Sequence, residues 1–221
     1  MRHLAQPRVL ISAATAALAT ALAGYPRLSL WLNRSYPLWY LEALLFFGAT
    51  VLWGFVFAWH THYTHRPVLT LKLEYGPLIV VTLAGIAVAT VFHLFLDPTL
   101  RLKMPEDYPT DRKHWLAMVS FTLAFSQLFL VFAPFAWLIR LFQNRRVATV
   151  LTVLFGAVVL TLKTRSPATP ISSGFFAVLL MARIGLGFLS ISFYLRGGVI
   201  LSWWWTFLIE ARHWFFLADN S

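Results

Sequence analysis

The chain alternates between long apolar runs and short polar loops. The runs cover residues 9–24, 38–59, 75–96, 115–142, 147–162, 171–194 and 194–216. About 20 apolar residues in a helix cross the roughly 30 Å hydrocarbon core of a bilayer. Backbone groups in lipid must be satisfied within the protein, and these runs are too long and continuous for barrel strands. The pattern predicts an all-α, polytopic transmembrane helical bundle of about seven spans.

Two local signals mark the ends of runs. Asp97-Pro98 after the third run is a proline stop, where we expect that span to end. The glycine pair Gly197-Gly198 between the last two runs can break one helix and start another.

The first run resembles a signal peptide. A short basic leader, residues 1–8, precedes an Ala-rich run that ends in the small residues Ala21-Leu22-Ala23. A basic leader, a short apolar region and small residues at the end are typical of secretory signals. We expect this segment to be retained as a first helix or signal anchor.

Composition supports one integral membrane domain over residues 1–221. Hydrophobic residues make up 59% of the chain and charged residues only 12%, which leaves too little polar surface for a soluble domain. We divide the domain into N-terminal spans, 1–132, and a C-terminal core, 133–216. Cysteine is absent, which excludes disulfides and thiolate chemistry. The expected location is the bacterial inner membrane.

The formal net charge of +10 indicates anionic lipid headgroups rather than nucleic acid as the partner. The Lys and Arg residues are scattered through short loops on both expected sides of the membrane, a distribution that suits headgroup contact. Because neither side holds a clear excess of them, the orientation stays open. An aromatic content of 17% also suits contacts with lipids, pigments or the helices of other membrane subunits.

Three polar residues in the last run form the first candidate site. Glu210, Arg212 and His213 are costly inside a membrane and usually face protein or water. On a helix Glu210 shares a face with Thr206 and His213. The alternative is that this end reaches the interface, where Arg212 and His213 extend toward headgroups.

A second intramembrane cation, Arg183, lies near the middle of the preceding span. We expect Arg183 and Glu210 to form a buried ion pair, since the two spans are adjacent. The alternative is that Arg183 meets backbone carbonyls or water.

Histidines provide the candidate metal and cofactor ligands. His60, His62 and His65 lie close together in the chain, and imidazole suits zinc, copper and iron. The alternative for these three is an interfacial polar belt at the end of a span. His93 or His213 could each provide an axial ligand to haem or another pigment, a weakly specific signal because one imidazole suffices. Glu210 and His213 have the Glu-x-x-His spacing of di-iron bundles, but those sites need two such motifs.

The sequence provides no catalytic residue. It lacks a serine-nucleophile motif, a glycine-rich phosphate loop and paired carboxylates within the spans, which are the usual signs of hydrolytic, nucleotide or acid–base chemistry.

Three features of the C-terminal core carry a family resemblance. They are the stretch from Ala133-Pro134 to Arg140, the residue Phe155, and the turn Tyr194-Leu195-Arg196-Gly197-Gly198. This layout resembles the CPBP family, which includes type II CAAX prenyl endopeptidases and bacterial abortive-infection proteins. That family carries Glu-Glu-x-x-x-Arg, then Phe-x-x-x-His, then a Tyr-Leu-Arg-x-Gly turn, then His-x-x-x-Asn.

The catalytic positions of the family are replaced in this chain. Phe135 and Ala136 stand at the glutamate pair and Val159 at the first histidine. Thr206 and Glu210 stand at the last histidine and the asparagine. The resemblance therefore implies a related helical fold from which the protease chemistry has been removed.

Three functions follow from these patterns. The first is a non-catalytic membrane protein that acts as a structural, assembly or accessory subunit of a membrane complex. The second is a metal-dependent membrane enzyme, either a CAAX-protease-like hydrolase or a metalloenzyme that uses the cluster of His60, His62 and His65. The third is a carrier or channel with Arg183 and Glu210 on its path.

Overall fold

The computed structural model describes residues 6–31, 35–65, 68–69, 74–164 and 171–218. These residues form helices and connecting turns, with no strand among them, so the all-α prediction is confirmed. Five of the helices are long and apolar enough to cross a membrane, which agrees with a multi-pass membrane protein. They are Pro7–Ser29, Leu38–Thr64, Tyr75–Lys103, Arg112–Phe142 and Ser173–Phe215. The finer prediction of about seven spans is not confirmed by this count.

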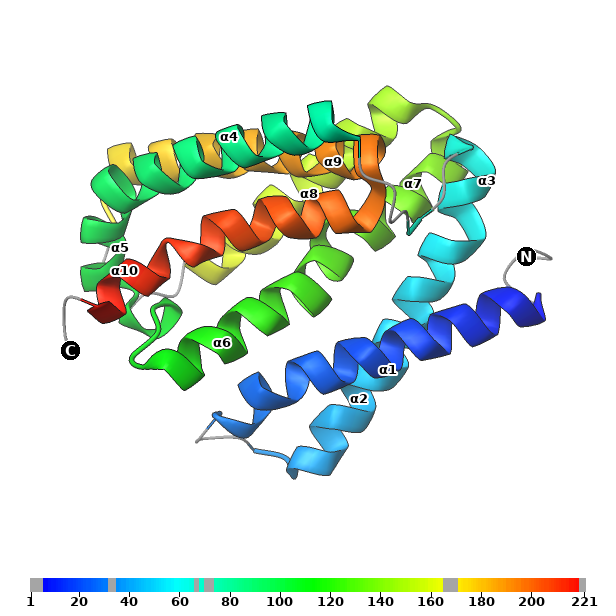
Figure 1. Ribbon diagram of the computed structural model, residues 1–221, viewed down its shortest axis with the longest axis horizontal. Helices are drawn as coiled ribbons and strands as arrows, with labels where there is room; N and C mark the ends of the chain where they lie inside the picture. Colours follow the sequence, from blue (N-terminus) through cyan, green and yellow to red (C-terminus); the bar gives the residue numbers. More distant parts are fainter. Residues whose placement is uncertain (1–5, 32–34, 66–67, 70–73, 165–170, 219–221) are drawn as a thin grey trace.

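The first two helices form a hairpin at one side of the molecule (Figure 1). They are α1 (Pro7–Ser29) and α2 (Leu38–Phe55). The buried face of α1 consists of small residues such as Ala17 and Gly24, which allow two helices to approach closely. A Cβ added at Gly24 would lie only 2.5 Å from Leu45 Cδ2. The retention of the first segment stays a prediction.

The next two segments are each a rod, that is, consecutive helices that follow one another without a break, and each rod contains a π-helical turn. The helix α2 continues through η1 (Val56–His60) into α3 (Thr61–Thr64). The second rod runs from α4 (Tyr75–Val91) through η2 (Phe92–Leu96) into α5 (Asp97–Lys103). A short 3-10 turn, η3 (Pro105–Asp107), follows this rod.

The expectation that the third span ends at Asp97-Pro98 is wrong, because α5 continues the helix to Lys103. Pro98 lies in the first turn of α5, a position where its missing N–H is tolerated. The π turn η2 immediately before α5 accommodates the change in hydrogen bonding.

Another rod runs from α6 (Arg112–Phe121) through η4 (Thr122–Ser126) and η5 (Leu128–Phe132) into α7 (Ala133–Phe142). The remaining helices are α8 (Arg145–Thr164), α9 (Ser173–Ala211) and α10 (His213–Ala218). Phe132, Phe135 and Tyr194, all fully buried, join α7 and its preceding turn to α9 in the main core. The rings of Phe132 and Tyr194 lie 4.6 Å apart.

The helix α9 folds back on itself. Gly197 and Gly198 leave helical geometry, with φ 68° and ψ −159° at Gly198, a region that is essentially restricted to glycine. Trp205 Nε1 donates to Ser190 Oγ at 3.1 Å, although 15 residues in a straight helix would span about 22 Å. The two halves of α9 therefore run antiparallel (Figure 1). The predicted break at the glycine pair is confirmed.

Candidate functional site

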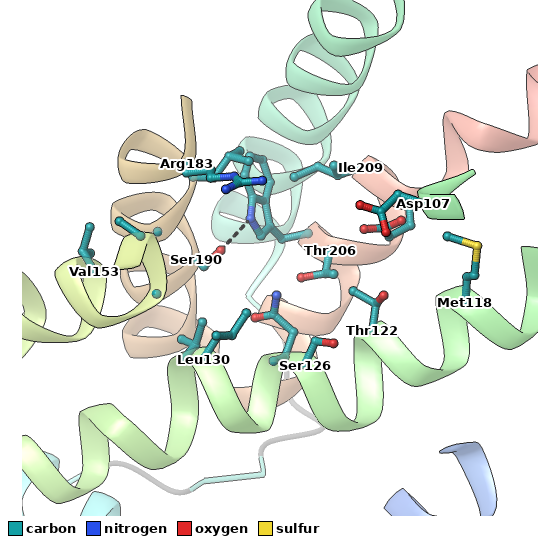
Figure 2. Close-up of a pocket in the computed structure, with 18 of the residues that line it drawn as sticks. Asp107, Met118, Thr122, Ser126, Leu130, Val153, Arg183, Ser190, Thr206 and Ile209 are labelled. Atoms are coloured by element: carbon teal, nitrogen blue, oxygen red, sulfur yellow. Dashed lines mark hydrogen bonds between the residues drawn. The ribbon is translucent and has the colours of Figure 1, made fainter. Parts of the chain in front are cut away.

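A cavity of about 380 Å³ lies inside the C-terminal bundle. Its walls come from the segment between α5 and α6, the α6–α7 rod, α8 and both halves of α9 (Figure 2). Small-molecule sites in proteins typically measure about 300–1,000 Å³, so this cavity has room for a small ligand. Charged, hydroxyl-bearing and apolar side chains all contribute to its surface.

The charged residues lie toward one end of the cavity. Ser190 and Trp205 lie at the same level, because they are hydrogen-bonded across the two antiparallel halves of α9. Arg183 is seven residues before Ser190 and Arg212 is seven residues after Trp205, so both lie about 10 Å along the helix axis from that pair. By the same count Glu210 lies within about 3 Å of the level of Arg183. Both Arg183 and Glu210 line the cavity. The ion pair between these two residues, expected from the sequence, stays a prediction.

A buried network connects this end of the cavity to α5. Arg212 Nε lies 3.0 Å from Asp97 Oδ2, and the Asp97 side chain is fully buried. Tyr108 Oη donates to Asp97 Oδ1 at 2.7 Å. Burial, followed by the negative charge of Asp97, raises the pKa of the Tyr108 hydroxyl well above its usual value, so Tyr108 stays a neutral donor.

Arg212 and His213, at the end of the candidate face, pack against other parts of the protein. His213 is only 5% exposed, and its Nε2 lies 3.6 Å from Glu210 Oε2. The ring of Tyr108 meets the His213 ring edge-on with centroids 5.0 Å apart. Arg212 is directed to Asp97. The packing thus favours a site inside the protein over the alternative in which Arg212 and His213 extend to headgroups, while Trp214 is exposed.

Uncharged polar groups line the middle of the cavity. Thr152 Oγ1 and Thr206 Oγ1 donate their protons to the carbonyls of Ala148 and Ser202, at 2.7 and 3.0 Å. Their oxygens therefore present lone pairs toward the cavity. Thr122 and Ser126 face the same space from the α6–α7 rod (Figure 2).

The part of the cavity farther from the charged end is apolar. Leu130 lies eight residues beyond Thr122 on the same rod, or about 12 Å along it. Val153 on α8 and Ile191 on α9 also contribute to the wall. The cavity therefore changes from charged through hydroxyl-bearing to apolar along its length.

The predicted metal and pigment ligands lie outside this cavity, except His213. His60 is 1% exposed and its ring lies 4.6 Å from that of Tyr194, whereas His62 and His65 are exposed. The described part of the chain holds no group of three His, Cys, Asp or Glu side chains that could bind a metal ion. His93 is partly buried against Phe215, with ring centroids 6.0 Å apart.

Several lining residues were not predicted from the sequence. Asp107 and Tyr108 come from the polar loop before α6, and Trp205 and Ser190 come from α9. The spacing of four residues between Thr122 and Ser126 is a helical-face signal that was available. No local signal marks Asp107, because its place depends on how the loop returns to the bundle.

The positions that resemble the CPBP catalytic residues lie in different surroundings. Phe135 and Ala136 are fully buried in the core, while Thr206 and Glu210 line the cavity. Arg140 points to another partner, with Cζ 4.4 Å from the centroid of the Trp59 ring. Comparisons with protein-family models, curated proteins and solved structures find no match to the chain.

Proposed function

We propose that this protein is a non-catalytic, multi-pass membrane protein that binds a small polar molecule inside its C-terminal bundle, as a carrier or as the binding subunit of a membrane complex. The observation that carries this proposal is the cavity of about 380 Å³, which holds Arg183, Asp107 and Glu210. Arg183 and Glu210 lie within an apolar helix that is long enough to span a membrane, where charged groups are costly and commonly mark a substrate or ion pathway.

The cavity favours binding over the other functions that the sequence suggested. A purely structural subunit has no need of a hollow lined by charged and hydroxyl groups. A CPBP-like hydrolase would need acids and histidines at the matching positions, and Phe135 and Ala136 stand there instead. We retain the CPBP-like core as a proposal about ancestry, supported by the glycine turn between the halves of α9.

A cavity-filling substitution tests the proposal. Gly156 lines the cavity on α8, and the nearest heavy atom to an added Cβ is the Leu130 carbonyl oxygen at 3.9 Å. The Cβ of Gly156→Leu therefore meets no clash, and we expect the rest of its side chain to enter the hollow. Gly185→Leu is the matched control, because Gly185 is an exposed residue of α9 with nothing within 4 Å of an added Cβ.

The measurement is thermal stabilisation of the purified protein in nanodiscs by a panel of small cationic, anionic, zwitterionic and neutral solutes, followed by uptake into proteoliposomes. We expect at least one solute to stabilise the wild type and Gly185→Leu but not Gly156→Leu. Uptake of that solute identifies a carrier, and binding without uptake identifies a binding subunit. Absence of stabilisation by every solute, or an equal response of Gly156→Leu, would contradict the proposal.

We further propose seven membrane crossings in the bacterial inner membrane, in contact with anionic headgroups and partner subunits. Two features support the two crossings beyond the five long apolar helices. The helix α8 has 20 residues, or about 30 Å of helix, which matches the hydrocarbon core. The reversal at Gly197 and Gly198 divides α9 into two antiparallel segments.

A further inference from the structure

We propose that the ligand of the cavity is a zwitterion, a molecule that carries an ammonium group and an acid group a few ångströms apart beside an apolar portion. This inference rests on the proposed binding function and names its ligand class. It follows from the arrangement of charge, hydrogen-bond acceptors and apolar surface along the cavity.

Groups of opposite charge occupy different walls of the cavity. Figure 2 shows Arg183 on α9 and Asp107 on the opposite side of the hollow, with Thr206 between them. Glu210 also lines the cavity, at nearly the same depth as Arg183 by the helix register given above. Arg212 also lines the cavity beside Glu210, but its charge is matched by Asp97, whose Oδ2 lies 3.0 Å from Arg212 Nε. A ligand between these walls therefore meets the Arg183 guanidinium on one side and carboxylates on the other.

This arrangement discriminates against ligands of a single charge. A simple amine is attracted by Asp107 and Glu210 but repelled by Arg183, and a simple acid meets the reverse. Such interactions are stronger in a partly desolvated bundle than in water. A zwitterion oriented with its acid toward Arg183 and its ammonium toward the carboxylates gains both attractions.

The uncharged walls fit the same orientation. The hydroxyl oxygens of Thr152 and Thr206 present lone pairs, since their protons go to backbone carbonyls, and an ammonium group offers donors to such acceptors. The indole of Trp205 adds an aromatic wall that attracts cations. Leu130 and Val153 provide the apolar surface for the remainder of the ligand.

Three matched probes test the proposal on the wild-type protein in phosphatidylglycerol nanodiscs, whose lipid has no ammonium group. L-Phenylalanine carries both charges, phenethylamine carries only the ammonium, and 3-phenylpropanoate carries only the carboxylate. We expect isothermal titration to show about tenfold tighter binding of L-phenylalanine than of either analogue. Because all three probes are compared on the unaltered protein, the result does not depend on whether a variant folds.

Variants that each remove one charge from the cavity then test which residue binds the acid group of the ligand and which binds its ammonium group. Arg183→Gln should reduce binding of L-phenylalanine to the level of phenethylamine, and Glu210→Gln should weaken binding of phenethylamine. Arg145→Gln is the control, since Arg145 is exposed at the start of α8 and does not line the cavity. Equal or tighter binding of either singly charged probe by the wild type would overturn the zwitterion proposal while leaving the binding function intact.

A lipid headgroup can supply the same chemistry, because phosphatidylethanolamine carries an ammonium and a phosphate. Repeating the titration in nanodiscs that contain phosphatidylethanolamine separates the two sources. Competition with L-phenylalanine would identify the headgroup as the occupant, and unchanged binding would identify a free solute. If no solute of any charge class binds and the Gly156→Leu test also fails, the proposed function itself is wrong.

Discussion

Charged side chains inside the bundle are held by specific partners from distant parts of the chain. Asp97 at the start of α5 accepts from Tyr108 and faces Arg212 at the end of α9. Arg212 also donates through Nη1 to the carbonyl of Ile209 at 2.8 Å. This network fixes the charged end of the cavity to α5, so the charged residues that line the cavity depend on Asp97 although Asp97 does not line it.

The first prediction concerns this buried pair. Asp97→Asn leaves Arg212 buried without its counter-charge, and breaking a buried pair from one side typically costs about 3–5 kcal/mol. We expect a large loss of stability, measured by unfolding of the protein in detergent. Because the cost is that of an uncompensated charge, the double variant Asp97→Asn/Arg212→Gln should be more stable than the single variant.

Glu106→Gln is the control for this experiment, because Glu106 is exposed on the neighbouring turn η3. Its stability should match that of the wild type, as is usual for an exposed substitution. A double variant less stable than Asp97→Asn would show that Arg212 is held by other groups and that its pairing with Asp97 is secondary.

At the scale of single elements, the turn within α9 determines where the two halves of the cavity wall meet. Gly198 supplies a backbone conformation that other residues avoid. The first amide after the turn, Val199 N–H, donates to the carbonyl of Val68 at 3.1 Å. The turn is therefore joined to the segment between α3 and α4 as well as to its own helix halves.

The second prediction is that Gly198→Ala strains this turn. A residue with a side chain at φ 68° and ψ −159° costs on the order of 1–3 kcal/mol, so we expect a lower melting temperature and weaker binding in the cavity. Gly185→Ala is the matched control, because Gly185 lies in a regular part of α9 with open space around it. That variant should be neutral or more stable by up to about 1 kcal/mol.

These elements also show what the sequence can and cannot predict. The apolar runs and the glycine pair predicted the helices and the break in α9, because periodicity and glycine conformations act locally. The prediction that Pro98 ends the third span was wrong. The π turn η2 before α5 accommodates the proline, and no clear sequence signal indicates that turn.

The cavity was only partly predictable, for a different physical reason. Arg183 and Glu210 were identified because charge is costly in an apolar run. Asp107 and Ser190 join them only after the loop and the hairpin fold back on the bundle. Their roles depend on contacts between distant parts of the chain, which no local pattern records.

In the whole molecule, contacts between distant segments group the loops at two opposite ends. At one end Val68 meets the turn of α9, His60 packs on Tyr194 and Arg140 stacks on Trp59. At the other end Asp97 meets Arg212 and Arg27 lies against His114. The balance of basic residues left the orientation open, but the contacts define which loops share a side.

The third prediction is therefore a topology. The protein contains no cysteine, so single cysteines introduced at exposed positions can be labelled from either face of oriented vesicles without background. If α8 and both halves of α9 cross the membrane, Asn144→Cys and Arg196→Cys should be labelled from one face. Thr110→Cys and Ser172→Cys should then be labelled from the other face, and all four positions are exposed.

Each pair of labels tests one crossing. Labelling of Ser172→Cys and Asn144→Cys from the same face would show that α8 does not span the bilayer. Labelling of Ser172→Cys and Arg196→Cys from the same face would show that the first half of α9 does not. The second result would move Arg183, about 15 Å along the helix from Ser173, away from the membrane interior. The energetic reason for treating its cavity as a ligand site would then be lost, because a solvated arginine needs no such explanation.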